Sequence, residues 1–224
     1  LSLRQDGKVV AWGLNGNMAL APVAGPATAP VVIDALSSVQ AVASTSINIA
    51  GQYYALKGDG KVVVWGQAST NAPFCGQQGI RTSPYALIDI SPIQGLSRIS
   101  QVEPGEGHTL FVDADGAVHA CGTNNAGQLG DGTLVNPSTE VPKIAHIAGL
   151  PPVVAAAAGA AKSAVIGVDG SVWVWGKTTN LARDGSDKST APVRVTQADG
   201  TAFDAGRVGE AAGTFAGGQA GPLS

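Results

Sequence analysis

Four short apolar segments recur along the chain, and each begins directly after an Asp-Gly pair. They read DGKVVAWG at residues 6–13, DGKVVVWG at 59–66, DGAVHACG at 115–122 and DGSVWVWG at 169–176. Their aspartates lie 53, 56 and 54 residues apart. Asp-Gly favours a tight hairpin turn, because glycine adopts the positive φ that this turn needs. A run with apolar residues on both alternating faces predicts a strand that is buried on both sides.

The remainder of each period predicts further strands. Leu1-Ser2-Leu3 looks like the strand before the first Asp-Gly, and β-rich runs start at Pro30-Val31-Val32-Ile33 and Pro192-Val193-Arg194-Val195. One period of about 54 residues therefore offers about four short strands separated by turns. That is one small antiparallel sheet per period, which is how the blade of a β-propeller is built.

The stretch VVAAAAGAA, which starts at Val153, tests this interpretation. Alanine is the best helix former, so local propensity alone favours a helix. The register of the repeat instead aligns the stretch with residues 39–43, VQAVA. We follow the register and predict a strand.

The motifs G-x-x-H, D-G-x-V-x-x-W-G and N-x-x-G-Q-L-G-x-G together resemble the repeat of the RCC1 (regulator of chromosome condensation) family, with a composition closer to its bacterial members. The best match runs from Gly105 to Thr133, while units one, two and four differ in their loops (GLNGNMAL, NAPFCGQQG and TTNLARDGS). The resemblance implies an all-β, RCC1-like β-propeller with four blades in this chain, forming a single domain over residues 1–224 that is cut in mid-repeat at both ends. The ring is then small, part of a larger ring, or completed by another copy of the chain.

Composition excludes several classes of partner. Charged residues make up 13% of the chain and the formal net charge is -3, without a Lys/Arg cluster, so no nucleic acid is expected as a partner. No apolar run approaches the ~20 residues of a membrane span, so membrane insertion is not expected either. The two cysteines, Cys75 and Cys121, are too few for a disulfide framework. We expect buried free thiols, with a single bridge as the alternative.

The residues able to carry chemistry are few. His108 fills the G-x-x-H position, where the resemblance implies a structural hydrogen bond. His119 and Cys121 share a strand face, which suits a Cys-His nucleophile pair or half a zinc site, but Cys121 takes a buried Trp position and we favour packing. Residues 113–116, DADG, are read as a hairpin turn and not as a calcium loop. The sequence predicts no catalytic residue, no cofactor and no metal ligand.

Four tryptophans and one polar turn supply the candidate contact residues. Trp12, Trp65 and Trp175 fill the same repeat position and are expected between blades, whereas Trp173 has no counterpart in the other units. Asn124 and Asn125 open the turn NNAGQLGDGT, where turn formation is the simpler role for them. We name Trp173, Asn124 and Asn125 as candidate contacts with a partner.

The leading hypothesis is a non-enzymatic β-propeller that binds a protein through its loops, since rigid repeats with variable loops suit recognition. The alternative is a structural module of a large bacterial secreted or cell-surface protein, or of an extracellular assembly. This alternative favours a secreted or surface location over the cytoplasm. A third class, nucleotide exchange on a small GTPase or inhibition of an enzyme, follows from the family resemblance alone, and no motif in the chain supports it.

Overall fold

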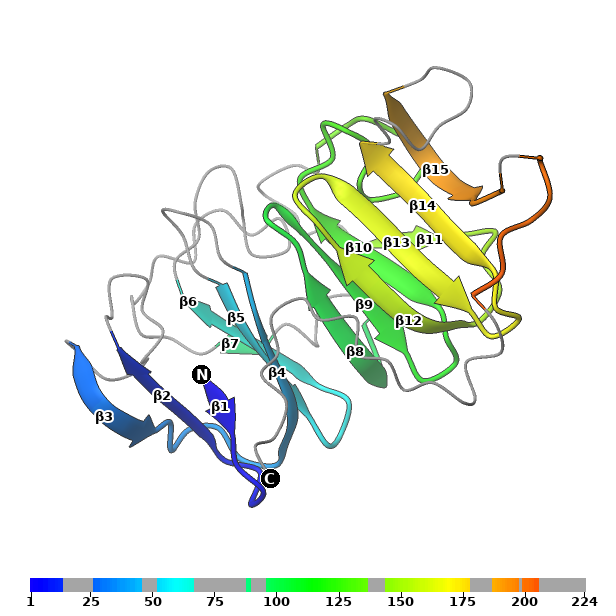
Figure 1. The fold of residues 1–224 in the computed structure, drawn as a ribbon. Helices are drawn as coiled ribbons and strands as arrows, with labels where there is room; N and C mark the ends of the chain where they lie inside the picture. Colours follow the sequence, from blue (N-terminus) through cyan, green and yellow to red (C-terminus); the bar gives the residue numbers. More distant parts are fainter. Residues whose placement is uncertain are drawn as a thin grey trace.

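The chain folds into four antiparallel β-sheets that follow one another in sequence order (Figure 1). The computed structural model describes residues 1–13, 26–45, 52–66, 88–89, 96–136, 144–177, 187–197 and 199–205. Sheet 1 holds three described strands, and sheets 2, 3 and 4 hold four each. No described residue is helical, which confirms the expected all-β class.

Strands succeed one another across each sheet as hairpins. Sheet 1 has the strand order β1-β2-β3, sheet 2 β4-β5-β6-β7, sheet 3 β11-β10-β9-β8, and sheet 4 β12-β13-β14-β15. The bounds are β1 Ser2–Leu3, β2 Val9–Gly13, β3 Ala27–Val32, β4 Val39–Ser44, β5 Gln52–Lys57, β6 Val62–Gly66, β7 Ile88–Asp89, β8 Ile99–Pro104, β9 His108–Asp113, β10 Val118–Gly122, β11 Ala145–Ile147, β12 Val153–Ala158, β13 Lys162–Gly167, β14 Val172–Lys177 and β15 Lys188–Arg194.

The alanine-rich stretch is a strand, as the repeat register predicted. It forms β12, which pairs with β13 just as β4 pairs with β5. Isolated helices depend on local propensity and length, whereas this segment gains a hydrogen-bonded partner along its whole side. Tertiary pairing therefore overrides the helical preference of alanine.

The Asp-Gly pairs form the predicted hairpin turns. Their glycines have φ values of 75°, 78°, 80° and 83° at residues 7, 60, 116 and 170. The carbonyl of each of the first three glycines accepts a hydrogen bond from the first residue of the next sheet, namely Val39, Ile99 and Val153. The turn thus closes a hairpin and also joins its sheet to the following one.

Three apolar clusters fill the spaces between successive sheets. Trp65 of sheet 2 packs with Val9 and Ala11 of sheet 1, and Trp175 of sheet 4 packs in the cluster that contains Val118 and Ala120 of sheet 3. Both tryptophans are 0% exposed. The expectation that the Trp position lies between blades is confirmed for these two residues.

Two expectations were wrong. Trp12 occupies the same repeat position but is 48% exposed, because no sheet lies against that face of sheet 1 among the described residues. Cys121 is not a free thiol but is disulfide-bonded. The other cysteine of the chain, Cys75, lies outside the described residues.

Candidate functional site

The turn at residues 123–136, which follows β10, is built around the side chain of Asn124. Its Oδ1 accepts a hydrogen bond from the Leu129 backbone N–H at 3.0 Å, and its Nδ2 donates to Asp131 Oδ1 and to the Thr133 carbonyl, each at 3.1 Å. Asn124 is 0% exposed. An asparagine that satisfies backbone groups on both sides of a turn replaces the hydrogen bonds of a regular element. The turn is therefore held from within.

The same turn is fastened to sheet 4. The Gln128 carbonyl accepts hydrogen bonds from Ser163 Oγ at 2.8 Å and from the Trp175 indole N–H at 2.9 Å. The Gly132 backbone N–H donates to the Thr190 carbonyl at 2.9 Å. These bonds reach strands β13 and β14 and the segment of β15, so the loop has a fixed position on two sheets.

Several side chains of this turn face solvent, and two of them are large and apolar. Asn125 is exposed, Leu134 is 49% exposed and Val135 is 71% exposed. Two adjacent apolar side chains on a fixed, solvent-facing turn offer apolar area that contact with another protein would bury. We call Asn125, Leu134 and Val135 the turn patch. Sequence reasoning named Asn125 but missed Leu134 and Val135, since nothing in the sequence separates them from buried apolar residues.

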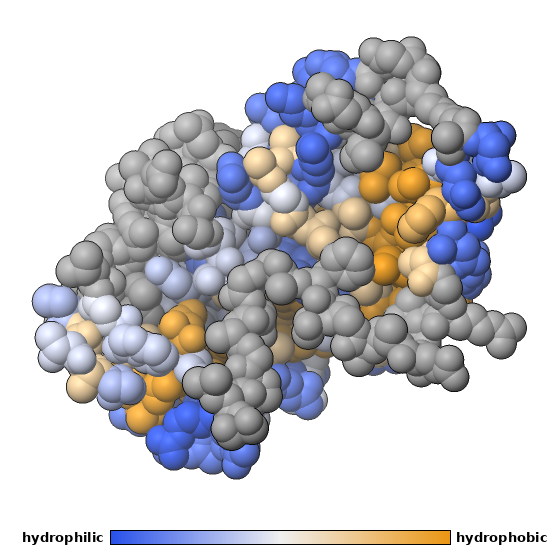
Figure 2. Space-filling view, in the orientation of Figure 1, coloured by the Kyte–Doolittle hydropathy of each residue, from blue (hydrophilic) through white to orange (hydrophobic). Residues whose placement is uncertain are grey.

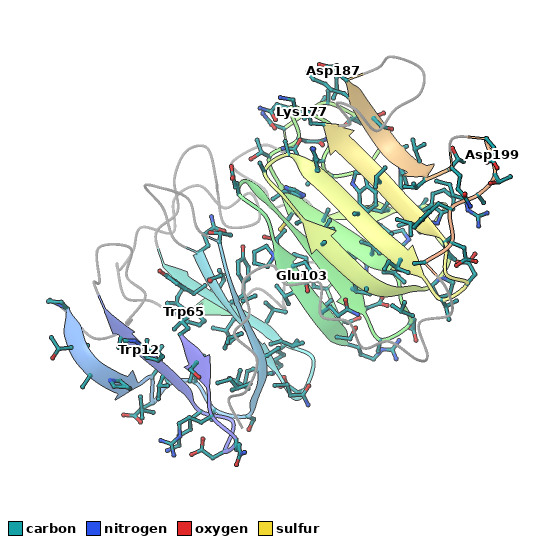
Figure 3. The ribbon with its side chains drawn as sticks, in the orientation of Figure 1. Trp12, Trp65, Glu103, Lys177, Asp187 and Asp199 are labelled. Atoms are coloured by element: carbon teal, nitrogen blue, oxygen red, sulfur yellow. The ribbon has the colours of Figure 1, made fainter. Side chains whose placement is uncertain are left out.

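The candidate contact Trp173 lies elsewhere. Its indole N–H donates to Ser171 Oγ at 2.8 Å, and its ring packs at the margin of the cluster between sheets 3 and 4. Figure 3 labels Lys177 at one end of sheet 4 and Asp199 near the other; Trp173 lies toward the latter end of β14. The structure therefore does not bring Trp173 together with Asn124 and Asn125.

His108 makes the structural hydrogen bond that the family resemblance implied. Its Nε2 lies 2.8 Å from Ser163 Oγ. The Ser163 hydroxyl donates to the Gln128 carbonyl, so the histidine must donate from Nε2 and carry no proton on Nδ1. The Nδ1 atom is buried without a partner. Burial lowers the pKa of His108 to about 4, partly opposed by the backbone at Lys162, so the ring is neutral at physiological pH.

A second polar link crosses the preceding interface at the equivalent place. The Tyr54 hydroxyl lies 2.9 Å from Thr109 Oγ1 and donates to Gln52 Oε1 at 2.8 Å. Burial raises the pKa of Tyr54 to about 12, with the hydrogen bond to Thr109 acting in the opposite direction. Both links join residues 55 positions apart, which is one repeat. They orient neighbouring sheets within otherwise apolar interfaces.

His119 and Cys121, which the sequence offered as a Cys-His pair or half a zinc site, have structural roles. Cys121 is disulfide-bonded and so offers no thiolate nucleophile or metal ligand in this state. His119 Nε2 lies 3.4 Å from Asp113 Oδ2, and its ring lies 5.2 Å from that of His146. Asp113 Oδ1 accepts backbone hydrogen bonds from Asp115 and Ala117, which confirms that residues 113–116 form a turn.

Two further properties concern the described part of the chain only. Its histidine, cysteine and acidic side chains form no group of three or more that would hold a metal ion. It contains no helix with the length and hydropathy needed to cross a membrane.

Burial raises the pKa of Glu103, on strand β8, to about 7 (Figure 3).

Two models of the regulator of chromosome condensation (RCC1) repeat match the chain, over residues 115–166 and residues 99–128. The RCC1 domain-containing protein RUG3, mitochondrial, of Arabidopsis thaliana is 27% identical over 208 residues, which cover 87% of this chain and 44% of that protein.

Solved structures show the same fold. Yeast RCC1 (Prp20), in the crystal structure with Kap60 bound, has a TM-score of 0.67 at 21% identity, covering 88% of this chain and 46% of that one. Human WBSCR16 has a TM-score of 0.68 at 20% identity, with 88% and 52% covered. The chain spans about half the length of these relatives. Residues 99–166 match the RCC1 repeat, and the four sheets of the chain adopt the fold of RCC1-type β-propellers.

Proposed function

We propose that this chain is a non-enzymatic protein-binding module and that the turn patch contacts its partner. The single observation that carries the proposal is the exposure of Leu134 and Val135, 49% and 71%, on a turn whose backbone is fixed by the buried Asn124. A rigid loop loses little conformational entropy when it binds, so its apolar contacts contribute nearly their full value to affinity.

The chemistry of the turn patch indicates the kind of partner. Leu134 and Val135 offer apolar area, and the exposed Asn125 beside them offers an amide. The Oδ1 atom of Asp131 accepts hydrogen bonds from the Thr133 N–H and hydroxyl and from the Asn124 amide, so this atom is engaged inside the turn. The patch fits a protein surface with apolar side chains and backbone or amide groups at its rim.

Two further observations support a binding role. The crystal structure of yeast RCC1 (Prp20), which has the same fold, contains Kap60 bound to it. The titratable groups that sequence reasoning considered for chemistry, His108, His119 and Cys121, serve hydrogen bonding, turn structure and a disulfide in this chain. Contact of Trp173 with a partner stays a prediction, and so do the single-domain boundary at residues 1–224 and the bacterial origin.

The test uses three proteins as baits for binding partners from the source of the protein. They are the whole chain, one double variant and one single variant. The variant Leu134→Asp/Val135→Asp is expected to lose at least tenfold of a specific partner that the parent chain retains. Val168→Asp is the control, because Val168 is an apolar residue that is 59% exposed but lies outside the turn patch, on the turn between β13 and β14. All three proteins should melt at similar temperatures, since the changed side chains are exposed. Equal retention by all three would contradict the proposal.

A second candidate, a structural module of a secreted or cell-surface assembly, is favoured by one observation. Cys121 is disulfide-bonded, and disulfides persist mainly in oxidising compartments. If this candidate is right, Cys121 in protein isolated from its source without reductant should resist alkylation and should become alkylated after reduction and unfolding. Alkylation of unfolded, unreduced protein at Cys121 would show a free thiol and would remove the support for a secreted location.

A further inference from the structure

Asp113, His119 and His146 lie on three neighbouring strands of sheet 3, namely β9, β10 and β11. His119 is directly opposite His146 in the register of β10 and β11, and directly opposite Phe111 in that of β9 and β10. Residues opposite each other point to the same face of a sheet, and so do residues two apart on one strand, such as Phe111 and Asp113. The three polar side chains therefore share one face. We call them the polar row.

The polar row lies on the face of sheet 3 that is turned toward sheet 2. Cys121, two residues from His119 on the same face of β10, packs with Val62 of sheet 2. The row is thus distinct from the apolar side chains that Figure 2 shows gathered over sheet 4. It lies near the Asp-Gly turn that precedes β10, whereas the turn patch follows the end of β10.

The carboxylate of Asp113 orients the ring of His119. Asp113 Oδ1 accepts backbone hydrogen bonds from Asp115 and Ala117, both at 2.9 Å, which fix the carboxylate. Asp113 Oδ2 lies 3.4 Å from His119 Nε2. Histidines that bind a metal through one ring nitrogen typically donate the other ring N–H to a carboxylate held in this way. Asp113 therefore supplies the outer partner that such a histidine needs.

The ring nitrogens that remain are open to a ligand. Among the described residues, neither His119 Nδ1 nor the nitrogens of His146 have a hydrogen-bond partner. In that part of the chain, His108 Nδ1 is the one buried side-chain nitrogen or oxygen without a partner. His119 Nδ1 also lacks a partner, so it must be reached by solvent. His146 is exposed.

The separation of the two rings suits a metal ion shared between them. The ring centroids of His119 and His146 are 5.2 Å apart, and the ring planes are inclined by 49°. A tetrahedral zinc ion about 2.0–2.1 Å from one nitrogen of each imidazole places the two ring centres about 5 Å apart. Imidazole nitrogen is also one of the ligands that zinc prefers in proteins.

We propose that His119 and His146 bind one Zn²⁺ ion and that Asp113 is the positioning residue that holds the His119 ring. Two protein nitrogens leave two positions of a tetrahedral shell for water. Asp113 is not counted as a ligand, in keeping with the lack of a three-residue metal group among the described residues. The ion links β10 to β11, the outermost strand of sheet 3, which pairs with β10 through three residue pairs.

This site departs from the expectation that the chain holds no metal ligand. The sequence offered His119 together with Cys121, because the two lie two positions apart on one strand. The sheet instead brings His119 beside His146, which comes from a strand farther along the chain. Only the register of β10 with β11 shows this pairing.

The test is isothermal titration calorimetry of the untagged, metal-free chain with zinc chloride, with the disulfide left intact. We expect the parent protein to bind one Zn²⁺ per chain. His146→Gln removes a ligand at an exposed position and should weaken binding by more than about tenfold. Asp113→Asn keeps an oxygen for the two backbone N–H groups but loses the charge, and should weaken binding by about tenfold. His108→Gln is the matched control, because it removes the third histidine of the chain, which is buried elsewhere, and should bind like the parent.

The NMR signals of the imidazole protons identify the ligands without any substitution. The chain has three histidines, so three sets of signals are expected. Those of His119 and His146 should shift as zinc is added, while those of His108 should not. A parent chain without saturable zinc binding, equal affinity in His146→Gln, or a shift at His108 in place of the other two would overturn the proposal. The partner proposed for the turn patch is tested independently, since these variants leave Leu134 and Val135 unchanged.

Discussion

Replacing Gly116 by alanine is expected to lower the free energy of unfolding by about 2–5 kcal/mol. Two costs add at this position. The residue has a φ of 80°, where a side chain costs about 1–2 kcal/mol. A Cβ would also lie 2.6 Å from the Val153 nitrogen and 2.9 Å from the Pro152 Cα, both in the backbone that enters sheet 4. That backbone must move away, which disturbs the hydrogen bond from Val153 to the Gly116 carbonyl.

Gly149→Ala separates the two costs. Gly149 has a φ of 82°, but a Cβ there would meet no atom within 4 Å. This variant should lose only the conformational part, about 1–2 kcal/mol. Urea unfolding followed by circular dichroism measures both values. Equal losses for the two variants would contradict this prediction. They would show that the close contact of Gly116 with the backbone of Pro152 and Val153 adds nothing to stability.

The features of the fold that recur in each repeat could be predicted from the sequence. Alignment of the four copies decides between helix and strand where one copy alone is ambiguous. The register placed a strand at residues 153–158 against the helical propensity of its alanines. The Asp-Gly pairs located the hairpins, and the resemblance of the G-x-x-H motif to the RCC1 repeat implied the structural role of His108. Each of these properties depends on contacts inside a unit or between two adjacent units.

Properties that depend on what lies beyond a unit could not be predicted in this way. Trp12 was expected to be buried because its repeat position is buried, but exposure depends on whether a sheet covers that face. Cys121 was expected to be a free thiol, with a bridge as the alternative, because two cysteines in the sequence do not decide between a thiol and a disulfide. Leu134 and Val135 were missed because apolar residues signal a core by default, and only the fixed turn around Asn124 turns them toward solvent.

The exposure of Asn124 and Asn125 also could not be predicted from the sequence, although the two residues are neighbours. The sequence treats them as two equal amides in one turn. In the structure Asn124 is 0% exposed and satisfies the backbone, while Asn125 is exposed. A partner can touch Asn125 directly, and Asn124 acts by holding the turn in place. The path of the whole loop decides which of the two adjacent amides is buried, and the sequence motif alone does not specify that path.

Acidification is expected to destabilise the protein through His108. In the unfolded chain a histidine has a pKa near 6.5, whereas burial lowers the pKa of His108 to about 4 in the folded protein. Between these two values the unfolded state binds a proton that the folded state does not. The free energy of unfolding therefore falls as the pH falls through this window, by about 3 kcal/mol for a shift of this size.

The variant His108→Gln isolates that contribution. A glutamine amide can still donate to Ser163 Oγ but does not titrate, so the variant should lose about 3 kcal/mol less than the parent between pH 7 and pH 4. All other titrating groups are common to both proteins. One of them, Glu103, acts in the opposite direction, since burial raises its pKa to about 7 and its carboxyl favours the folded state as the pH falls. Urea unfolding at half-unit steps of pH gives both curves. Parallel curves would mean that His108 is hydrated or charged in the folded protein, and that the link between sheets 3 and 4 is not the neutral, Nε2-protonated arrangement described above.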